Sequence, residues 1–309
     1  MAQPFAVGLS IWNRPKHSQA SADALANAIC YSKIPVVVYI HADGPRNSQE
    51  KALCAESLES VLSIFAHYEI EHKVIRQVEN IGLSASVRCL AIEIFTKHSF
   101  AFFVEDDIVM SLQTIDFVSK LESIREIHNE VWSISAFDSR TNIKGGPNRF
   151  SKRFSSWGWC TWKDRWDLVQ FNQDLVFDFF EFHSPYLNTF IIGKDWVNVA
   201  VNNIFEKNDS WAVYFQISSL LLGGKHLYPH GSYVANMGWD GSGVHCGIDN
   251  SLSGDPSKLS IRDICNKARL FPQYWNLRYL FDLNALPNRW TFREVRSFKK
   301  MLRLKKSRA

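Results

Sequence analysis

Three consecutive carboxylates, Glu105, Asp106 and Asp107, directly follow a run of Phe, Ala and Val at residues 100–104. Carboxylates this close repel one another, and their burial is costly unless a positive charge meets them. Mg²⁺ and Mn²⁺ prefer hard oxygen ligands, and Mg²⁺ usually binds through one or two carboxylates plus substrate phosphates. The triplet therefore predicts a divalent metal site, and the alternative interpretation is an exposed acidic turn.

Charged residues also end the two earlier apolar segments of the chain. Arg14 follows the segment 5–12, and Asp43 ends the β-branched segment 35–43. An Arg can stack on a nucleotide base or pair with phosphate, and an Asp can accept the N3–H of uracil. The sequence has no GxGxxG after the first segment and no GxxxxGK[ST], which argues against a Rossmann dinucleotide site or a P-loop. These residues indicate a nucleotide site that uses a metal in place of a glycine cradle.

The elements that must position these residues alternate through the first 140 residues. The predicted strands cover residues 5–12, 35–43, 72–77, 100–107 and 131–138, and the predicted helices cover residues 18–32, 47–67, 84–97 and 112–128. This alternation predicts βαβ units and a parallel sheet, which binds its ligands at the carboxyl ends of the strands. Asp43, the acidic triplet and Asp138 all fall at such ends.

The second half of the chain reads differently. From residue 145 a Gly-, Trp- and Arg-rich segment runs GGPNRFSKRFSSWGWCTWKDRW, followed by helical patterns near residues 164–180 and 195–207. We find no internal repeat and no linker between independent domains. The second half is therefore expected to complete one cleft together with the first.

Composition narrows the class of protein. The 309 residues are 46% hydrophobic, which suffices for a full core. The six cysteines form no CxxC pair, which argues against a disulfide framework or a zinc site and indicates a reducing compartment. We see no basic segment followed by a long apolar run, and no stretch approaches 18 apolar residues. We therefore expect neither a signal peptide nor a transmembrane helix, and a cytoplasmic protein.

The order of these motifs resembles that of the GT-A fold glycosyltransferases. The similarity is strongest to N-acetylglucosaminyltransferase I and to bacterial cell-surface polysaccharide glycosyltransferases, and it covers roughly residues 4–247. Arg14 matches the family's nucleotide-contacting stretch after the first strand. Asp43 matches the Asp that holds uracil, and the family's Glu-Asp-Asp stands as Glu105–Asp107. The resemblance implies that Asp107 binds Mn²⁺ or Mg²⁺ and that Glu105 or Asp106 holds the sugar or ribose.

Three stretches of the second half match the family more loosely. Trp157, Gly158 and Trp159 are similar to the Gly-Leu-Gly-Trp segment that floors the donor and acceptor sites. The stretch 194–196 matches the family's catalytic Trp-Asp-Asp-Trp only in part, because one acid is missing. The stretch 240–245 resembles the flexible loop that folds over the diphosphate.

These looser matches imply further roles. Asp195 is the candidate base that takes the proton of the acceptor hydroxyl, unless it is simply an acid at a helix start, and the alternative base is Asp209. His245 is a candidate metal ligand. Ser242 and Gly243 belong to a loop that could hold phosphate and exclude water from the donor.

We therefore expect an α/β protein of GT-A type, with a Rossmann-like, mostly parallel central sheet, flanking helices and a helical, aromatic-rich acceptor region. The expected glycosyltransferase domain spans residues 1–250, divided into a nucleotide-sugar half (1–140) and an acceptor and catalytic half (141–250). Residues 251–309 form a helical extension. The expected activity is metal-dependent, inverting transfer of a hexosyl or N-acetylhexosaminyl group from a nucleotide-sugar, such as a UDP-sugar, to a glycan or lipid-linked glycan in bacterial surface polysaccharide synthesis.

Two other classes stay open on the residues alone. A sugar-phosphate nucleotidyltransferase also uses strand-end acids and a metal, although it would normally carry a glycine- and Lys/Arg-rich phosphate loop early in the chain. A non-catalytic protein that binds sugar or nucleic acid could use the many aromatic residues and the basic tail.

The carboxyl-terminal tail carries the basic excess. From Arg289 onward there are nine Lys or Arg and one Glu, which gives the tail a charge of +8. Since the whole chain has a net charge of +4, the remaining residues carry about −4. Its apolar residues have the spacing of a basic amphipathic helix that lies on a membrane surface. We expect an anionic membrane surface as its partner, with the protein peripheral at the inner face and no nucleic acid bound. The alternative is a helix packed on the domain.

Overall fold

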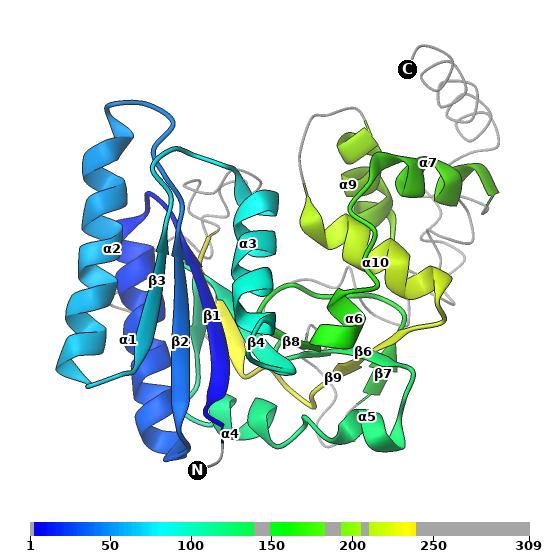
Figure 1. Cartoon of the computed structure of the whole chain (residues 1–309). Coiled ribbons are helices and arrows are strands. Elements are labelled where there is room, and N and C mark those ends of the chain that lie inside the picture. The colour runs from blue at the N-terminus through cyan, green and yellow to red at the C-terminus, as the bar shows by residue number, and fades with distance from the viewer. Residues whose placement is uncertain (1–2, 139–148, 183–192, 205–209, 239–309) are drawn as a thin grey trace, which may run out of the picture.

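The computed structural model describes residues 3–138, 149–182, 193–204 and 210–238 (Figure 1). Its central sheet has eight strands in the order β3-β2-β1-β4-β8-β6-β9-β7. These strands are β1 (Phe5–Ile11), β2 (Val36–Ala42), β3 (His72–Arg76), β4 (Phe100–Glu105), β6 (Val131–Ser135), β7 (Arg149–Ser151), β8 (Trp159–Trp162) and β9 (Lys225–Tyr228). A separate two-stranded sheet pairs β5 (Ile108–Met110) with β10 (Val234–Asn236).

The helices lie on both faces of the central sheet (Figure 1). They are α1 (Pro15–Ser32), α2 (Glu50–His67), α3 (Leu83–Phe95), α4 (Thr114–Ser119), α5 (Ile124–Ile127), α6 (Lys163–Trp166), α7 (Gln173–Phe182), α9 (Lys194–Ile204) and α10 (Trp211–Leu221). Helices α1, α2 and α4 share one core with the sheet, and α3, α7, α9 and α10 share the other.

Strand direction confirms the predicted Rossmann-like, mostly parallel sheet with flanking helices. Strands β3, β2, β1 and β4 run parallel, and β6 runs parallel to β9. Strand β8 is antiparallel to both of its neighbours, β4 and β6, and edge strand β7 is antiparallel to β9. The sequence pattern missed β8, because its four residues lie within a Trp-rich run that shows no period-two alternation.

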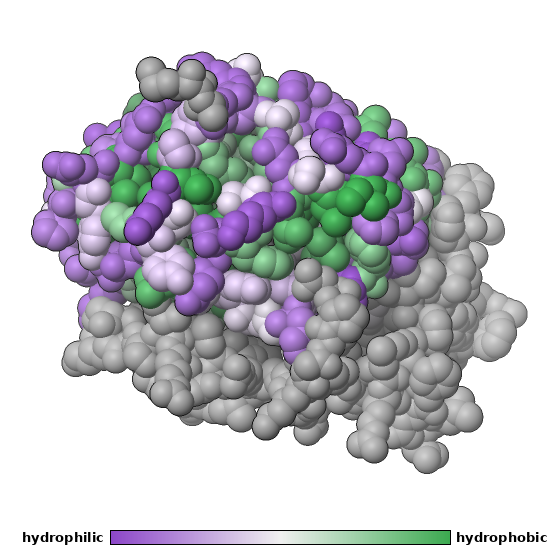
Figure 2. Space-filling view, turned by 90° about the horizontal axis from the view of Figure 1, so that it is seen from below, coloured by the Kyte–Doolittle hydropathy of each residue, from purple (hydrophilic) through white to green (hydrophobic). Residues whose placement is uncertain are grey.

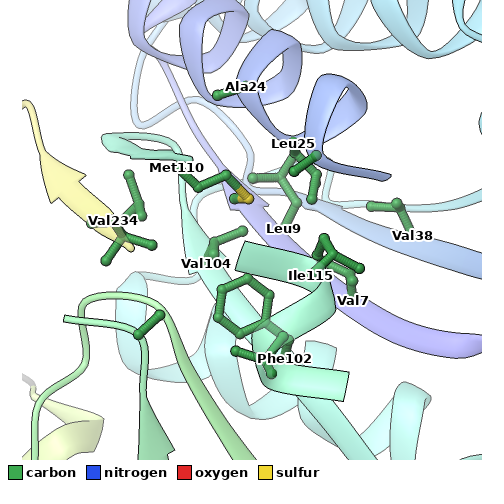
Figure 3. Close-up of a cluster of buried hydrophobic side chains, with 14 of the residues drawn as sticks. Val7, Leu9, Ala24, Leu25, Val38, Phe102, Val104, Met110, Ile115 and Val234 are labelled. Atoms are coloured by element: carbon green, nitrogen blue, oxygen red, sulfur yellow. The ribbon is translucent and has the colours of Figure 1, made fainter. Parts of the chain in front are cut away.

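Side chains of β4 alternate between the two cores. Phe100, Phe102 and Val104 enter the core shared with α1, whereas Ala101 and Phe103 enter the core shared with α3. Figure 3 shows Phe102 and Val104 beside residues of β1 and α1. The next side chain, Glu105, continues the alternation toward α3. The pleat of one buried strand therefore decides the direction of the first acid of the triplet.

The second core is built largely from aromatic rings. Trp159 of β8 stacks on Phe103 and on Trp211, with both ring centroids 4.8 Å away, and Phe154 meets it edge-on at 5.2 Å. Stacked and edge-to-face pairs at these distances are favourable beyond the area that they bury. These contacts fasten α10 and the segment before β8 to the part of the sheet that contains β4.

Two predicted helices are each divided in the structure. Residues 112–128 form α4 and α5, and residues 164–180 form α6 and the first part of α7. In the second case the side chain of Asn172 accepts the backbone N–H groups of Asp174 (2.5 Å) and Leu175 (3.2 Å). Such capping starts a new helix at this point. The prediction of one helix over residues 112–128 was wrong, because α4 and α5 divide that range.

The described residues were compared with what a membrane-spanning helix requires. In the part of the chain that the structure describes, no helix is both long and apolar enough to cross a bilayer. Seen from below, hydrophilic residues surround a few small hydrophobic patches (Figure 2). The tail from residue 289 lies outside the described residues, so its membrane contact stays a prediction.

Gln216, buried on α10, joins this helix to the chain before β8. Its Oε1 accepts the N–H of Phe154 (2.7 Å), and its Nε2 donates to the carbonyl of Lys152 (2.9 Å). Lys152 in turn donates from Nζ to the carbonyls of Gly223 (2.9 Å) and Gly224 (3.1 Å), just beyond the end of α10. The side-chain amide of Gln216 therefore fixes the backbone of residues 152–154 against α10, at one side of the aromatic core.

Replacing this amide tests that role. Gln216→Leu leaves the buried N–H of Phe154 unpaired, and we expect it to lower the free energy of unfolding by about 1–3 kcal/mol. The matched variant Gln113→Leu, on an exposed side chain, should change it by less than about 0.5 kcal/mol. Urea denaturation measures both, and equal effects would contradict the assignment.

Candidate functional site

The acidic triplet lies at the carboxyl edge of the central sheet. Strand β4 ends at Glu105, and Asp106 and Asp107 form the turn into β5. Strands β1 and β4 are parallel neighbours with Ser10 opposite Glu105, so both chains leave the sheet at the same place. Arg14 lies between β1 and α1, directly before Pro15, which occupies the first turn of the helix. The topology thus brings Arg14 to the acids, whereas the sequence predicts a metal as the positive partner of the acids and a nucleotide as the partner of Arg14.

One guanidinium bridges the two aspartates. Arg14 donates from Nη2 to Oδ1 of Asp106 and from Nε to Oδ2 of Asp106 (3.3 Å). Its Nη1 and Nη2 each lie 3.2 Å from Oδ2 of Asp107. Burial by itself would lower the pKa of Arg14, but the charges of Asp106 and Asp107 outweigh it and raise that pKa. The cluster is a buried, charge-assisted network.

Asp107 is only partly satisfied by this network. Burial raises the pKa of its carboxyl, opposed by the charge of Arg14 and, less strongly, by that of the buried His17. Its Oδ1 is buried and has no hydrogen-bond partner among the described residues. Most buried polar atoms have a partner, so an orphaned carboxylate oxygen indicates that something outside the described chain completes it.

The turn after β10 packs against Asp107. The N–H of Met237 donates to the backbone carbonyl of Asp107 (2.7 Å), which holds this turn against the acid. A Cβ added to Gly238 would lie 2.5 Å from Oδ2 of Asp107 and 3.2 Å from Oδ1 of Asn236. A side chain at this position would collide with the carboxylate, so glycine suits the close approach of this turn to Asp107. Asn236 and Gly238 could not be found from the sequence, because the pairing of β5 with β10 leaves no local signal.

The side-chain oxygens of Asp107 and Asn236 are suitable ligands for a hard divalent cation. The candidate ligand atoms of Asp107 and Asn236 are oxygens, which Mg²⁺ and Mn²⁺ prefer, and Oδ1 of Asp107 has no partner among the described residues. Within the described ranges no group of three or more His, Cys, Asp or Glu side chains could hold a metal alone. A site with one or two protein oxygens needs ligands from the substrate, and phosphates commonly supply them.

Glu105 faces a different space from Asp107. It lines a small pocket together with Ser10, Leu90, Trp159 and Trp211. Burial, reinforced by the charges of Asp107 and Asp106, raises the pKa of Glu105 to about 8. Near neutral pH this carboxyl is therefore largely protonated and can both donate and accept a hydrogen bond.

Asp43 connects two loops at the same edge. Its Oδ1 accepts the N–H groups of Gly44 (2.8 Å) and Ile81 (2.9 Å), and its Oδ2 accepts Nδ2 of Asn80 (2.8 Å) and the N–H of Gly82 (3.2 Å). These four donors fill the usual capacity of a carboxylate. A uracil N3–H would have to replace one of them, and the base-binding role of Asp43 stays a prediction.

The Trp-Gly-Trp segment splits between core and edge. Trp159 is 2% exposed and belongs to the aromatic core. Trp157 is partly buried and meets Phe137 edge-on at 4.6 Å. Gly158 has φ +61°, and its carbonyl accepts the N–H of Ala136 (2.7 Å), so glycine suits the position. Of the two tryptophans, Trp157 is the better placed for a ligand.

Asp138, the acid expected after β6, has an ion pair of its own. Nη2 of Arg149 lies 3.1 Å from its Oδ1, and this guanidinium lies 4.3 Å from the ring centroid of Tyr228. The buried carboxylate and the cation above the aromatic ring hold β7 and β9 against the end of β6.

Several predicted residues fall outside the described parts of the chain. Asp195 lies in the first turn of α9, but its side chain is not described. Asp209, Ser242, Gly243 and His245 lie in undescribed segments. Their roles stay predictions.

Comparisons with known proteins show distant likenesses only. No family model matches the chain, and no curated protein sequence matches it. Among solved structures, the galactosyltransferase LgtC in complex with donor and acceptor sugar analogs is 9% identical at TM-score 0.37, covering 72% of this chain and 73% of that chain. UDP-glucose pyrophosphorylase complexed with UDP-glucose is 9% identical at TM-score 0.32, covering 71% of this chain and 99% of that chain. A glucose-1-phosphate thymidylyltransferase from Bacillus anthracis, named as putative and solved in complex with a sucrose, is 9% identical at TM-score 0.27, covering 70% and 95%. Likeness at this level carries no conclusion about activity.

The raised pKa of Glu105 predicts a pH-dependent stability. Between its ordinary value of 4.5 and about 8, the folded protein keeps a proton that the unfolded chain releases. The free energy of unfolding should therefore fall as pH rises through this window. Glu105→Gln removes the ionisation, so the wild type should lose more stability than the variant between about pH 5 and about pH 8.5. Urea denaturation at both pH values measures this difference, and parallel losses would refute it.

Proposed function

We propose that this protein is a metal-dependent glycosyltransferase that moves a hexosyl or N-acetylhexosaminyl group from a UDP-sugar to a glycan acceptor, with inversion. The observation that carries the proposal is the buried cluster of Arg14, Asp106 and Asp107, in which Oδ1 of Asp107 lacks a partner among the described residues. It lies at the carboxyl edge of a mostly parallel sheet, where ligands of such folds bind.

In this proposal, each residue at the site binds a different part of the nucleotide-sugar donor. Asp107, with the amide oxygen of Asn236 nearby, would hold Mn²⁺ or Mg²⁺, and Arg14 would donate hydrogen bonds to phosphate oxygens. The bound ion would supply a Lewis acid that offsets the charge of the departing diphosphate. Glu105, in its pocket beside Trp159, would hydrogen-bond a ribose or sugar hydroxyl.

The acceptor side of the proposal rests on residues whose side chains are not described. Asp195 in the first turn of α9, or Asp209, takes the proton of the attacking hydroxyl. Ser242, Gly243 and His245 belong to a loop that covers the diphosphate and excludes water. The acceptor is a glycan or lipid-linked glycan of a bacterial surface polysaccharide, and the basic tail holds the enzyme at the anionic inner face of the membrane.

The turn between β1 and α1 favours transfer of the sugar over synthesis of the nucleotide-sugar. It consists of Trp12, Asn13 and Arg14 and contains no glycine. A nucleotidyltransferase would normally place a glycine- and Lys/Arg-rich loop there to hold a triphosphate. Release of pyrophosphate from a nucleoside triphosphate and a sugar phosphate would support that other class.

Removing the charge of Asp107 tests the proposed function. Asp107→Asn should abolish Mn²⁺-dependent thermal stabilisation by UDP-sugars and lower sugar transfer by about a hundredfold or more. UDP release from UDP-glucose, UDP-galactose and their N-acetylhexosamine counterparts measures the transfer. The matched variant Asp116→Asn changes a partly exposed acid that pairs with Lys120, and it should change neither readout.

Absence of any metal-dependent thermal shift would contradict the proposal. The wild type would be screened against UDP-, GDP-, dTDP- and CMP-sugars, with and without Mn²⁺. A protein that binds sugar without catalysis would keep its ligand affinity in the Asp107→Asn variant.

A further inference from the structure

Arg14 engages the carboxylate on which the proposed cation site depends. Its four side-chain hydrogen bonds among the described residues all go to Asp106 and Asp107. The two bonds to Asp107 share one oxygen, Oδ2, whereas Oδ1 has no hydrogen-bond partner among the described residues. A cation on Asp107 would therefore lie within a few ångströms of the guanidinium.

Two positive groups on one buried carboxylate oppose each other. The site is largely shielded from water, since the side chains of Arg14 and Asp107 are 14% and 10% exposed, so solvent screens this repulsion poorly. Either the guanidinium keeps its place and the cation binds weakly, or the guanidinium must move. Movement requires another acceptor for its N–H groups, because an unpaired buried charge is costly.

The position of Arg14 allows such a movement. Its backbone is fixed, because its carbonyl accepts the N–H of Ser18 (2.9 Å) and Pro15 restricts the chain that follows. Beyond Cα, only the two carboxylates hold the side chain among the described contacts. The Nε and Nη2 atoms form a fork on Asp106, whereas both bonds to Asp107 are 3.2 Å long. The guanidinium can thus release Asp107 while it still contacts Asp106.

Arg46, at the same edge of the sheet, shows the contrasting arrangement. Its Nε and Nη2 bond Oε1 of Glu50 at 3.0 and 2.6 Å, and its guanidinium lies 4.3 Å from the ring centroid of Trp12. Glu50 and Trp12 thus hold Arg46 on two sides, and neither residue belongs to the proposed metal site. Of these two arginines, Arg14 is the one that contacts Asp106 and Asp107.

We propose that Arg14 competes with the cation for Asp107, and that a diphosphate ends the competition by accepting the hydrogen bonds of its guanidinium. This inference rests on the proposed function and adds a regulation of the same site. Cation and diphosphate then bind with positive cooperativity, because each relieves a cost that the other would meet alone. The cation site is strong only when a donor is present.

The test measures Mn²⁺ binding without any turnover. Free Mn²⁺ is followed by electron paramagnetic resonance, and UDP is titrated calorimetrically into protein in EDTA or in excess Mn²⁺. In the wild type, Mn²⁺ should tighten UDP binding by about tenfold or more. Arg14→Gln should bind Mn²⁺ alone about tenfold more tightly than the wild type, and the tightening of UDP by Mn²⁺ should shrink.

Two further variants separate competition from other effects of the substitution. Arg14→Lys keeps the positive charge, so its affinity for Mn²⁺ alone should stay close to that of the wild type. Arg125→Gln removes a charge from α5, which precedes β6 and so lies at the opposite edge of the sheet, and it should change neither constant. Thermal denaturation shows whether each variant is folded.

Three outcomes would overturn the inference. One is an unchanged or weaker affinity of Arg14→Gln for Mn²⁺ alone, which a purely structural or nucleotide-binding role of Arg14 predicts. Another is an affinity of the wild type for UDP that is the same with and without Mn²⁺. This outcome would overturn the inference even if Arg14→Gln fails to fold. The third is an equal gain in Arg125→Gln. If Mn²⁺ with UDP still binds in a manner that Asp107→Asn abolishes, the proposed function survives these failures. If neither ligand binds any variant, both fail.

Discussion

One buried guanidinium pairs with two buried aspartates where β4 leaves the sheet. Burying the charge of Arg14 would be costly without the ion pairs that it makes with Asp106 and Asp107. The sheet supplies the meeting point, because β1 and β4 are parallel neighbours that end together. The rest of the fold maintains this arrangement: α1 anchors the arginine, and the turn after β10 presses Gly238 against Asp107.

The two faces of β4 give neighbouring acids different chemistry. Glu105 follows the strand pleat into a pocket under α3 and α10, where burial keeps its proton to about pH 8. Asp106 and Asp107 lie past the strand, where Arg14 supplies a counter-charge. Glu105 can thus donate a hydrogen bond in its pocket, whereas Asp106 and Asp107 accept the hydrogen bonds of Arg14. The aromatic core around Trp159 fixes this division, because it packs β8 and α10 against the same strand.

Sequence reasoning reached the features that local patterns encode. The apolar runs of β1, β2 and β4 and the helical spacing between them predict the parallel half of the sheet, and they place Arg14 and the acids at the ends of its strands. The ion pairs between Arg14 and the two aspartates were not predicted. Strand β8, the clamp of Gln216 and the turn at Gly238 depend on contacts between segments far apart in the chain. Asp43 shows a further limit: its residue type allows base recognition, but only the structure reveals the four donors that already fill its carboxylate.

The most direct test of the account is anomalous diffraction from crystals grown with Mn²⁺ and UDP. We predict a manganese peak beside Asp107, next to the turn at Asn236 and Gly238, with the guanidinium of Arg14 moved from Asp107 to the diphosphate. A manganese peak elsewhere, or UDP bound away from this edge while Arg14 still bridges both aspartates, would contradict it.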